Sequence, residues 1–391
     1  MWNRQPVGTF RGLGISPSRM GLSGIPASVT SGNMQYFLDD DSYAWQRTPF
    51  TGFVINDGTG DQVAVPDCVL CIPSQGEPVL VLTPIRNRDM GNITVRKVIG
   101  PLAMFTGMLE ATLTGSRFAI GNSCYSYLED YIHEFNPDAQ IVKGEDFGRK
   151  LRAIKDEKEI AIIRRLCEFT DETMEKTTHI LRPGISNWEV EQYLYDLGKE
   201  LGCVEQPFGP TVRFYQTGKE RDFRVDGYRT SSVLKEGSSI SFDYGYTWRG
   251  YNTDFGRSFY CGKAPEESRR AYAVLQEAQQ MVIDRIQPGD PMTYGFRMIH
   301  DHVEKAGYTD CVRHYFDFDL LGHQVGIEVN EGPWLHTQQT EVFRPGMIFT
   351  IEPKFWWPEH CFMRVEDMIL MTDHGAECLT NFDRNRFELD V

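Results

Sequence analysis

The sequence predicts an α+β protein of two domains, the second of which is built from two similar halves. Three observations support this prediction. The chain is 391 residues long, short apolar runs alternate with turn-rich segments in its first part, and helix and strand signals recur at matching intervals in its second part. Since one domain typically takes about 100–200 residues, this length suggests two domains or three. We expect the domains to be residues 1–148 and 149–391.

The first part of the chain predicts a small α/β domain. The apolar runs TGFVIN, EPVLVLTP and SRFAIG are typical of short strands, and SYLEDYIHEF is typical of an amphipathic helix. Among the nine cysteines, only Cys68 and Cys71 form a C-x-x-C pair, inside the apolar run CVLCIP. We interpret them as buried thiols, because no second such pair is present to complete a zinc site.

A helix that begins near residue 157 is expected to open the second domain. Asp156 and Glu159 have the spacing of a capping box, and Ser186 and Glu189 repeat that spacing before a second helix. One face of the first helix is apolar, which predicts burial against a core. The residues of this face are Ile160, Ile163, Cys167 and Met174.

The second domain contains the same pattern of glycines, helices and acids twice. Gly184 and Gly202 lie 18 positions apart around one predicted helix, and Gly289 and Gly307 lie 18 positions apart around another. Each helical pair leads to a predicted strand that ends in an acid six residues after a glycine. Such a repeat predicts two helix–helix–hairpin halves.

Each half carries two acids in matching order. They are Asp243 and Asp254, 11 positions apart, and Glu352 and Glu366, 14 positions apart, so we expect a carboxylate on each of four strands. A carboxylate at the end of a buried strand is costly unless it is neutralised. Four that converge at a pseudo-twofold axis would raise one another's pKa values unless cations bind.

His323, in the glycine-flanked segment LLGHQVGIEVNEGP, is the candidate imidazole ligand beside these acids. Four carboxylates and one imidazole suit two divalent first-row ions about 3.5–4 Å apart. Taken singly, each acid could be a helix cap or a salt-bridge partner, and His323 a core histidine. The matched set favours a metal centre.

At these residues the sequence resembles the pita-bread metalloenzymes: methionine aminopeptidase, aminopeptidase P, prolidase and their relative creatinase. The strings that carry the resemblance are FDYG with Asp243, YNTDFGRSF with Asp254, GHQVGIEVNEGP with His323, TIEP with Glu352 and RVED with Glu366. The segment LRAIKDEKEIAIIRR is similar to the domain junction of that family. The resemblance implies a pita-bread domain with a curved antiparallel sheet, preceded by a creatinase-like N-terminal domain.

The resemblance also implies the site. Asp243, Asp254, His323, Glu352 and Glu366 are the expected ligands of two divalent metal ions, manganese first, with Fe, Co or Zn as alternatives. A metal-bridged hydroxide would be the nucleophile. Glu352 would also carry the proton to the leaving group. Arg364 would orient Glu366 from behind. A homodimer is expected on the same resemblance.

The sequence departs from the family at three histidines that are not ligands. Their positions hold Asp226, Asp319 and Asn330, so donors expected to bind a peptide carbonyl are missing. We regard Asp226, Asn330 and Glu331 as candidate catalytic residues. Acids beside aromatic rings suit a cationic substrate group, and the candidate substrate-binding residues are Asp319, Tyr228 and Trp334.

Three functions stay open. The first is a metallohydrolase of the Xaa-Pro peptidase lineage that cleaves the C–N bond of a short peptide or small molecule. The second is a metal-dependent lyase or hydrolase of a small cationic or zwitterionic compound, similar to dimethylsulfoniopropionate lyase or creatinase, with Glu328, Glu331 or Asp226 as the base. The third is a non-catalytic binding protein.

The composition excludes other classes. Lys and Arg total 40 against 55 Asp and Glu, a formal charge of −15, whereas nucleic-acid binders carry clustered basic residues. No apolar run approaches the about 18 residues of a membrane span, and the first residues lack the apolar segment of a secretory signal. We therefore expect a cytoplasmic protein without nucleic-acid or membrane partners.

Overall fold

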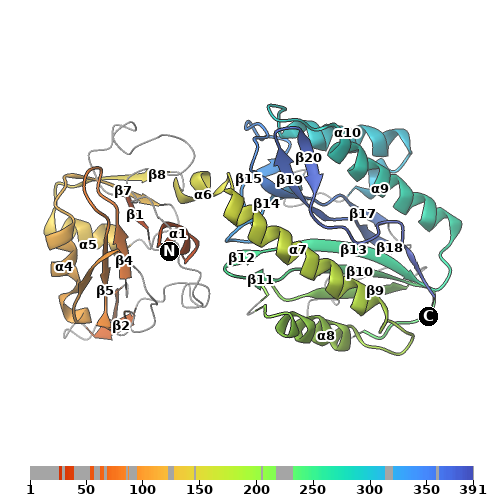
Figure 1. The fold of residues 1–391 in the computed structure, drawn as a ribbon, viewed down its shortest axis with the longest axis horizontal. Helices are drawn as coiled ribbons and strands as arrows, with labels where there is room; N and C mark the ends of the chain where they lie inside the picture. The colour runs from red at the N-terminus through yellow and green to blue at the C-terminus, as the bar shows by residue number, and fades with distance from the viewer. Residues whose placement is uncertain are drawn as a thin grey trace. The chain divides into compact units, whose positions relative to one another are not determined.

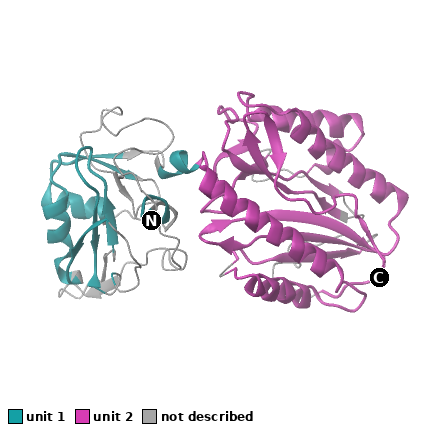
Figure 2. Ribbon diagram, viewed as in Figure 1, with its two compact units in different colours: residues 1–152 teal, residues 153–391 magenta. Residues whose placement is uncertain are grey.

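The computed structural model divides into two compact units, residues 1–152 and 153–391, which Figures 1 and 2 show as ribbons. Each unit is treated by itself below. The residues that the structure describes are 26–28, 31–38, 53–56, 62–65, 68–84, 87, 95–121, 127–144, 147–203, 206–216, 232–312, 320–357 and 361–390.

Unit 1 is built on a six-stranded mixed sheet. Its strand order is β6-β5-β4-β1-β7-β8, and β2 pairs with β3 in a separate hairpin. The strands are β1 (Pro26–Ser28), β2 (Phe53–Asn56), β3 (Gln62–Val65), β4 (Cys68–Cys71), β5 (Val79–Leu82), β6 (Arg96–Ile99), β7 (Arg117–Gly121) and β8 (Gln140–Gly144). The predicted strands and the helix over SYLEDYIHEF are therefore present.

Helices cover this sheet and explain its apolar strands. The helical segments are α1 (Ser31–Leu38), η2 (Leu102–Met104), α4 (Phe105–Thr112), α5 (Tyr127–Phe135) and α6 (Phe147–Arg152). Val69 and Cys71 of β4 pack in one cluster with α4 and α5, whereas Cys68 and Leu70 pack in another with α1. Successive side chains of a strand point to opposite faces. Both faces of β4 are thus buried, and burial raises the pKa of the Cys71 thiol to about 12.

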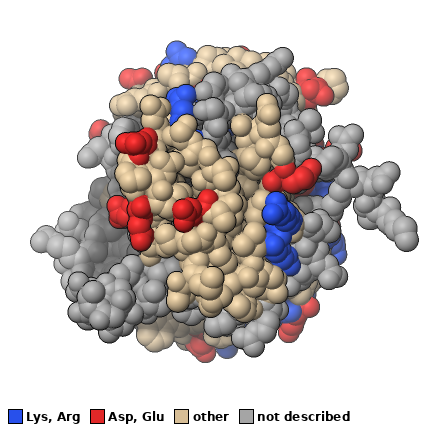
Figure 3. All heavy atoms as spheres, turned by 90° about the vertical axis from the view of Figure 1, so that its left-hand side faces the viewer, with Lys and Arg blue, Asp and Glu red and all other residues tan. Residues whose placement is uncertain are grey.

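Figure 3 shows the charged residues on one face of the protein. On the face that Figure 3 shows, Lys and Arg of the described residues are scattered and form no continuous basic patch. Within the described part of the chain, no helix is long and apolar enough to cross a membrane.

Unit 2 begins each of its halves with two helices. They are α7 (Glu157–Thr178) and α8 (Asn187–Glu200) in the first half, and α9 (Glu266–Arg285) and α10 (Thr293–Lys305) in the second. Both predicted capping boxes are confirmed: Asp156 and Glu159 cap α7, and Ser186 and Glu189 cap α8. These reciprocal bonds satisfy backbone N–H groups that a helix start leaves unpaired.

Each half continues into a sheet that is antiparallel except where β21 pairs with β13 in parallel. The first sheet has the order β21-β13-β10-β9 and the second β15-β14-β16-β19-β20, with hairpins β11–β12 and β17–β18 beside them (Figure 1). The strands are β9 (Thr211–Gln216), β10 (Ser238–Tyr244), β11 (Thr247–Trp248), β12 (Tyr251–Asn252), β13 (Phe255–Cys261), β14 (Leu320–Gln324), β15 (Glu331–His336), β16 (Ile348–Ile351), β17 (Lys354–Trp357), β18 (Cys361–Arg364), β19 (Asp367–Thr372), β20 (Gly375–Cys378) and β21 (Glu388–Leu389); a short 3-10 segment, η3 (Thr309–Cys311), follows α10.

Each half has a large apolar cluster of its own, and a smaller cluster is shared between them, with Ile163 and Cys167 of α7 packed against Ile348 and Met368. One cluster holds apolar residues of α7, α8, β10 and β13, and another those of α9, α10, β16 and β19. A backbone bridge joins the two sheets, since the Glu366 N–H donates to the Gly256 carbonyl at 3.0 Å. The internal repeat read from the sequence is therefore a repeat of structure.

Gly322 marks the closest approach within the second sheet. A Cβ atom at Gly322 would lie 2.0 Å from the carbonyl oxygen of Thr350 in β16. Only a glycine lets β14 come this near to β16, and the next residue on β14 is His323.

We predict that Gly322→Ala lowers the free energy of unfolding by about 3 kcal/mol or more, because the strands must move apart to admit the methyl group. Gly209→Ala is the matched control, since nothing lies within 4 Å of a Cβ there. Urea denaturation of both variants in the presence of a chelator measures the difference. Equal stability of the two variants would contradict the packing described here.

Candidate metal centre

The four repeat-matched acids lie at the seam between the two sheets. Asp243 is in β10, Asp254 directly precedes β13, Glu352 directly follows β16, and Glu366 lies between β18 and β19. The expectation that each acid lies on a strand is therefore right for Asp243 only. Within a strand, successive side chains point to opposite faces of the sheet. A residue just beyond the strand end is not held to this alternation, so its side chain can turn toward the seam.

These acids converge on His323 of β14. The Nε2 atom of His323 lies 3.3 Å from Oδ2 of Asp254 and 3.7 Å from Oε1 of Glu352. Ligand atoms of Asp254, His323 and Glu366 all lie within 4.8 Å of one another. The set is deeply buried, since His323, Asp254, Glu352 and Glu366 are 4%, 5%, 6% and 1% exposed.

Two of the buried oxygens fit a metal ion. Oδ1 of Asp254 and Oε1 of Glu366 have no hydrogen-bond partner among the described residues. A buried carboxylate oxygen without a donor is costly, and a divalent cation removes that cost. Carboxylate oxygens with one imidazole nitrogen are also ligands that first-row divalent ions accept. The residues present therefore fit the metal ions that the sequence implies.

The pKa shifts of these side chains show that two carboxylates of the cluster resist ionisation when no cation is bound. Burial raises the pKa of Asp254 to about 6, and the nearby charge of Asp243 adds to the rise. Burial also raises the pKa of Glu366 well above its usual value, with Asp254 and Glu352 acting in the same direction. Burial opposes the charged form of His323, but its hydrogen bond to Asp254 leaves its pKa raised. Protons and cations therefore compete for this cluster.

Two basic side chains offset part of this charge. Nη1 of Arg364 contacts Oδ2 of Asp243 and lies 3.2 Å from Oε2 of Glu366, so Arg364 holds two of the acids together. Nζ of Lys354 contacts Oε2 of Glu352. Burial is the largest effect and would raise the pKa of Glu352, but the nearby charges of Lys354, His323 and Arg364 together outweigh it, and the pKa is lowered.

A cavity of about 490 Å³ opens onto the cluster. Its lining consists of Phe208, Asp243, Asp254, Leu320, His323, Asn330, Trp334, His336, Glu352, Lys354, Arg364 and Glu366. Asn330 and Trp334, both singled out from the sequence, thus lie on its wall, and the Trp334 ring centroid is 5.5 Å from that of His323.

Sequence reasoning missed Phe208, Leu320 and Lys354 as cavity residues. Lys354 carried a usable signal, because it lies two positions after Glu352. Residues two apart in extended chain point to the same side. Phe208 comes from a segment with no motif, whereas Leu320 begins the segment LLGHQVGIEVNEGP but is an ordinary apolar residue there.

Glu331, a candidate catalytic residue in the sequence, lies elsewhere. It is fully buried, and its Oε2 atom is 3.3 Å from Nζ of Lys155, which also donates to Oε1 of Gln324 at 3.4 Å. Glu331 is not among the described residues that line the cavity. Asp226, Tyr228 and Asp319 lie outside the described residues.

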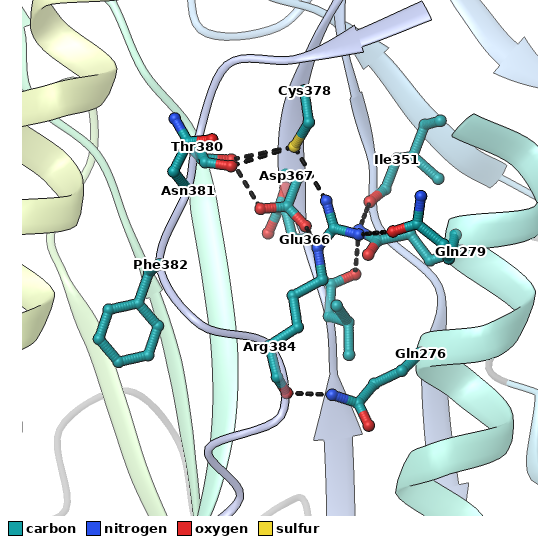
Figure 4. Close-up of polar contacts among 12 residues, drawn as sticks. Gln276, Gln279, Ile351, Glu366, Asp367, Cys378, Thr380, Asn381, Phe382 and Arg384 are labelled. Atoms are coloured by element: carbon teal, nitrogen blue, oxygen red, sulfur yellow. Dashed lines mark hydrogen bonds and ion pairs between the residues drawn. The ribbon is translucent and has the colours of Figure 1, made fainter. Parts of the chain in front are cut away.

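A buried polar network supports Glu366 from behind. Arg257 donates through Nη1 to the Glu366 carbonyl at 2.6 Å and pairs through Nη2 with Oδ1 of Asp367 at 2.5 Å. Asp367 also accepts from the Thr380 hydroxyl at 2.6 Å and pairs with Nε of Arg384 at 2.9 Å (Figure 4). Arg257 and Asp367 are almost completely buried, at 1% and 0% exposed.

Gln279 of α9 holds the backbone beside both glutamates of the second half. Its Nε2 donates to the Ile351 carbonyl at 2.9 Å and to the Val365 carbonyl at 3.3 Å (Figure 4). Ile351 precedes Glu352, and Val365 precedes Glu366. One amide thus fixes the spacing of two candidate ligands.

Comparison with known proteins gives one family and a common fold. The model of metallopeptidase family M24 matches residues 161–373. The Xaa-Pro dipeptidase of Pyrococcus furiosus is 28% identical over 264 residues, which are 68% of this chain and 73% of that protein. An uncharacterized peptidase of Bacillus subtilis, YqhT, is 28% identical over 244 residues, 62% of this chain and 67% of that protein.

Solved structures agree. The prolidase of Pyrococcus horikoshii superposes with a TM-score of 0.77 at 22% identity, covering 94% of this chain and 96% of that one. The dipeptidase PepE of Mycobacterium ulcerans gives 0.78 at 19%, with 96% and 95% covered. The predicted pita-bread, two-domain α+β fold is confirmed.

We predict that Arg257→Met lowers the free energy of unfolding by about 3–5 kcal/mol, because buried Asp367 loses its fully buried cationic partner and the Glu366 carbonyl loses a donor, although Arg384 and Thr380 still contact Asp367. Arg164→Met is the control, since Arg164 and Glu377 form a pair whose side chains are 41% and 42% exposed. Such an exposed pair contributes less than about 1 kcal/mol. Denaturant unfolding of both variants without metal measures the effect, and similar losses would contradict it.

We predict that Mn²⁺ raises the midpoint of thermal unfolding of chelator-treated protein, because only the folded chain brings the ligands together. An ion at 100 times its dissociation constant stabilises the folded state by about 2.7 kcal/mol. Asp254→Asn should remove most of the gain. Glu304→Gln is the control, because His300, Asp301 and Glu304 form the other, more exposed group of possible ligands in the described chain. Loss of the gain in Glu304→Gln instead would place the ion there.

Proposed function

The chain belongs to metallopeptidase family M24, and from this premise we propose that it is a metal-dependent hydrolase that cleaves the amide bond of short Xaa-Pro peptides. One observation carries the proposal. Three buried carboxylates, the partly exposed carboxylate of Asp243 and one imidazole line a cavity of about 490 Å³, a size that suits a small substrate.

We assign the ligand role to Asp243, Asp254, His323, Glu352 and Glu366. Two ions are proposed because five side chains offer more oxygen ligands than one ion needs, and manganese is the first ion to test. When bound, such ions supply Lewis-acid activation of water and of the substrate carbonyl.

The side chains of this chain would do the rest. Glu352 would accept a proton from the attacking water and deliver it to the nitrogen of the leaving amine. The water oxygen bonds to the carbonyl carbon as the C–N bond breaks, so one water is consumed for each amide cleaved. Arg364 would keep Asp243 and Glu366 in place through the two contacts it makes to them.

The wall of the cavity would orient the substrate. The Asn330 amide can donate to or accept from a peptide group. Trp334 offers a flat apolar surface beside His323, which suits a ring such as that of proline. A substrate that fills the cavity would displace water from it and strengthen the polar contacts there.

Two finer points belong to the proposal. The resemblance to the pita-bread enzymes supports a homodimer, which light scattering of the purified protein would measure.

The described cysteines are free thiols, which is compatible with the reducing cytoplasm that we propose as the location.

We predict that Mn²⁺-loaded protein releases free proline from Gly-Pro and related dipeptides, with two ions bound per chain. Glu352→Gln should lower kcat by about 10²–10⁴-fold, because the proton carrier is lost. Glu341→Gln is the control, because Glu341 is exposed and lies outside the cavity lining.

Mass spectrometry of the products decides between reaction classes. Hydrolysis adds one water to the substrate, whereas a lyase would release an alkene from a small zwitterion without water uptake. Full activity of Glu352→Gln, or an alkene product, would contradict the proposed function.

A further inference from the structure

We propose that Thr170 of α7 and Gln279 of α9 are equivalent positioning residues, one for each pair of acids, and that each raises the affinity of the cluster for divalent ions. Both would act from the side away from the cavity. This inference rests on the ligand role proposed above for the acids. Two independent observations carry it: the place of the two residues in the internal repeat, and their hydrogen bonds to the neighbours of the acids.

The two residues occupy the same place in the repeat. Thr170 lies thirteen positions after the first residue of α7, and Gln279 lies thirteen positions after the first residue of α9. Thr170 and Gln279 are 109 positions apart, which is also the interval between Asp243 and Glu352. The repeat therefore matches a buried polar residue on a helix as well as the acid that follows it along the chain.

In the second half, one amide serves both acids. The Nε2 atom of Gln279 donates to the carbonyl of Ile351 at 2.9 Å and to that of Val365 at 3.3 Å (Figure 4). These two residues directly precede Glu352 and Glu366. A single donor thus ties together the two backbone segments from which the glutamates project.

In the first half, α7 reaches the neighbours of both aspartates. The hydroxyl of Tyr244, the residue after Asp243, donates to the Thr170 carbonyl at 2.7 Å. The hydroxyl of Thr253, the residue before Asp254, lies 3.0 Å from the hydroxyl of Thr170. Because the Thr170 hydroxyl donates its one hydrogen to a carbonyl of its own helix at 3.0 Å, Thr253 is the donor in this contact.

All of these contacts are buried. Thr170, Thr253, Tyr244 and Gln279 are each 0% exposed, and the two helices pack against the large apolar clusters of their halves. A polar side chain in such surroundings is costly unless it is hydrogen-bonded. An apolar side chain of similar size would avoid this cost, so the bonds to the neighbours of the acids explain why polar residues stand at both positions.

The expected consequence is tighter metal binding. Neither Thr170 nor Gln279 is among the described residues that line the cavity, so each would act on a bound ion through the acids. Ligands bind a metal ion best when the surrounding residues already hold them in place. Replacement of a residue that orients a ligand typically costs about 10–100-fold in metal affinity.

Calorimetric titration of metal-free protein with Mn²⁺ tests the proposal. Thr170→Val and Gln279→Met should each raise the dissociation constant about 10–100-fold, whereas Thr170→Ser, which keeps the hydroxyl, should bind within about threefold of the wild type. Thr170→Val keeps nearly the volume of threonine, so it tests the proposal even if Gln279→Met does not fold.

Each helix offers a matched control. Thr177→Val removes another fully buried hydroxyl of α7, one that donates to the Thr173 carbonyl of the same helix at 2.6 Å. Gln276→Met removes another amide of α9, one that donates to the Arg384 carbonyl, which is not next to a candidate ligand (Figure 4). Both control variants should bind Mn²⁺ with the affinity of the wild type.

The visible absorption of bound Co²⁺ gives a second readout, because it depends on the arrangement of the ligands. The spectrum should change in Thr170→Val and Gln279→Met and stay unchanged in both controls. Wild-type affinity and spectrum in Thr170→Val and Gln279→Met would overturn the positioning role and leave the ligand role standing. Equal weakening by Thr170→Ser and Thr170→Val would attribute the effect to packing and overturn the role of the hydroxyl.

A wild-type protein that binds neither Mn²⁺ nor Co²⁺ would overturn the ligand role, and the positioning role with it. The wild type and the variants therefore report separately on the proposed function and on this inference.

Discussion

The gathering of four carboxylates at one seam, three of them buried, is the constraint on which the rest of this structure depends. Asp254, Glu352 and Glu366 are nearly inaccessible to water, and like charges so close together oppose folding. The chain offsets them from two sides. Arg364 and Lys354 contact them at the cavity, while Arg257 holds the backbone of Glu366 from the core. The divalent ions proposed for the cavity would complete the compensation, so folding and metal binding are coupled here.

The repeated architecture makes such a seam possible. Each half has a large apolar cluster behind its own sheet, and a smaller cluster joins α7 of the first half to β16 and β19 of the second. Apolar packing therefore holds the halves together away from the polar seam. The bridge between Gly256 and Glu366 then brings the two sheets together at the acids. Side chains that do not reach the cavity, Gln279 and Asp367 above all, fix the backbone on which the acids stand. The site is therefore rigid because of contacts made on the side away from the substrate.

The sequence was sufficient to predict the fold and the residues that converge. The repeated spacing of glycines and acids predicts two similar halves, and two similar halves bring equivalent residues together. It was insufficient for contacts between distant positions. Nothing local marks Glu331 as a partner of Lys155, 176 residues earlier, and a polar residue inside a motif was easily taken for a catalytic one. Lys354 was overlooked for the opposite reason, since the motif before it drew attention to Glu352 alone.

The ion pair between Lys155 and Glu331 also limits where a different N-terminal domain could be joined to the second unit. Lys155 precedes α7 and its backbone N–H donates to the Gly346 carbonyl at 2.8 Å, while its ammonium meets Glu331, which starts β15 close to Asn330 and Trp334. The first residues of the second unit are thus part of the support of the cavity wall. When recombination joins a new N-terminal domain to this unit, the wall keeps this support if the crossover falls before the codon of Lys155. A crossover after that codon replaces Lys155 and removes the support.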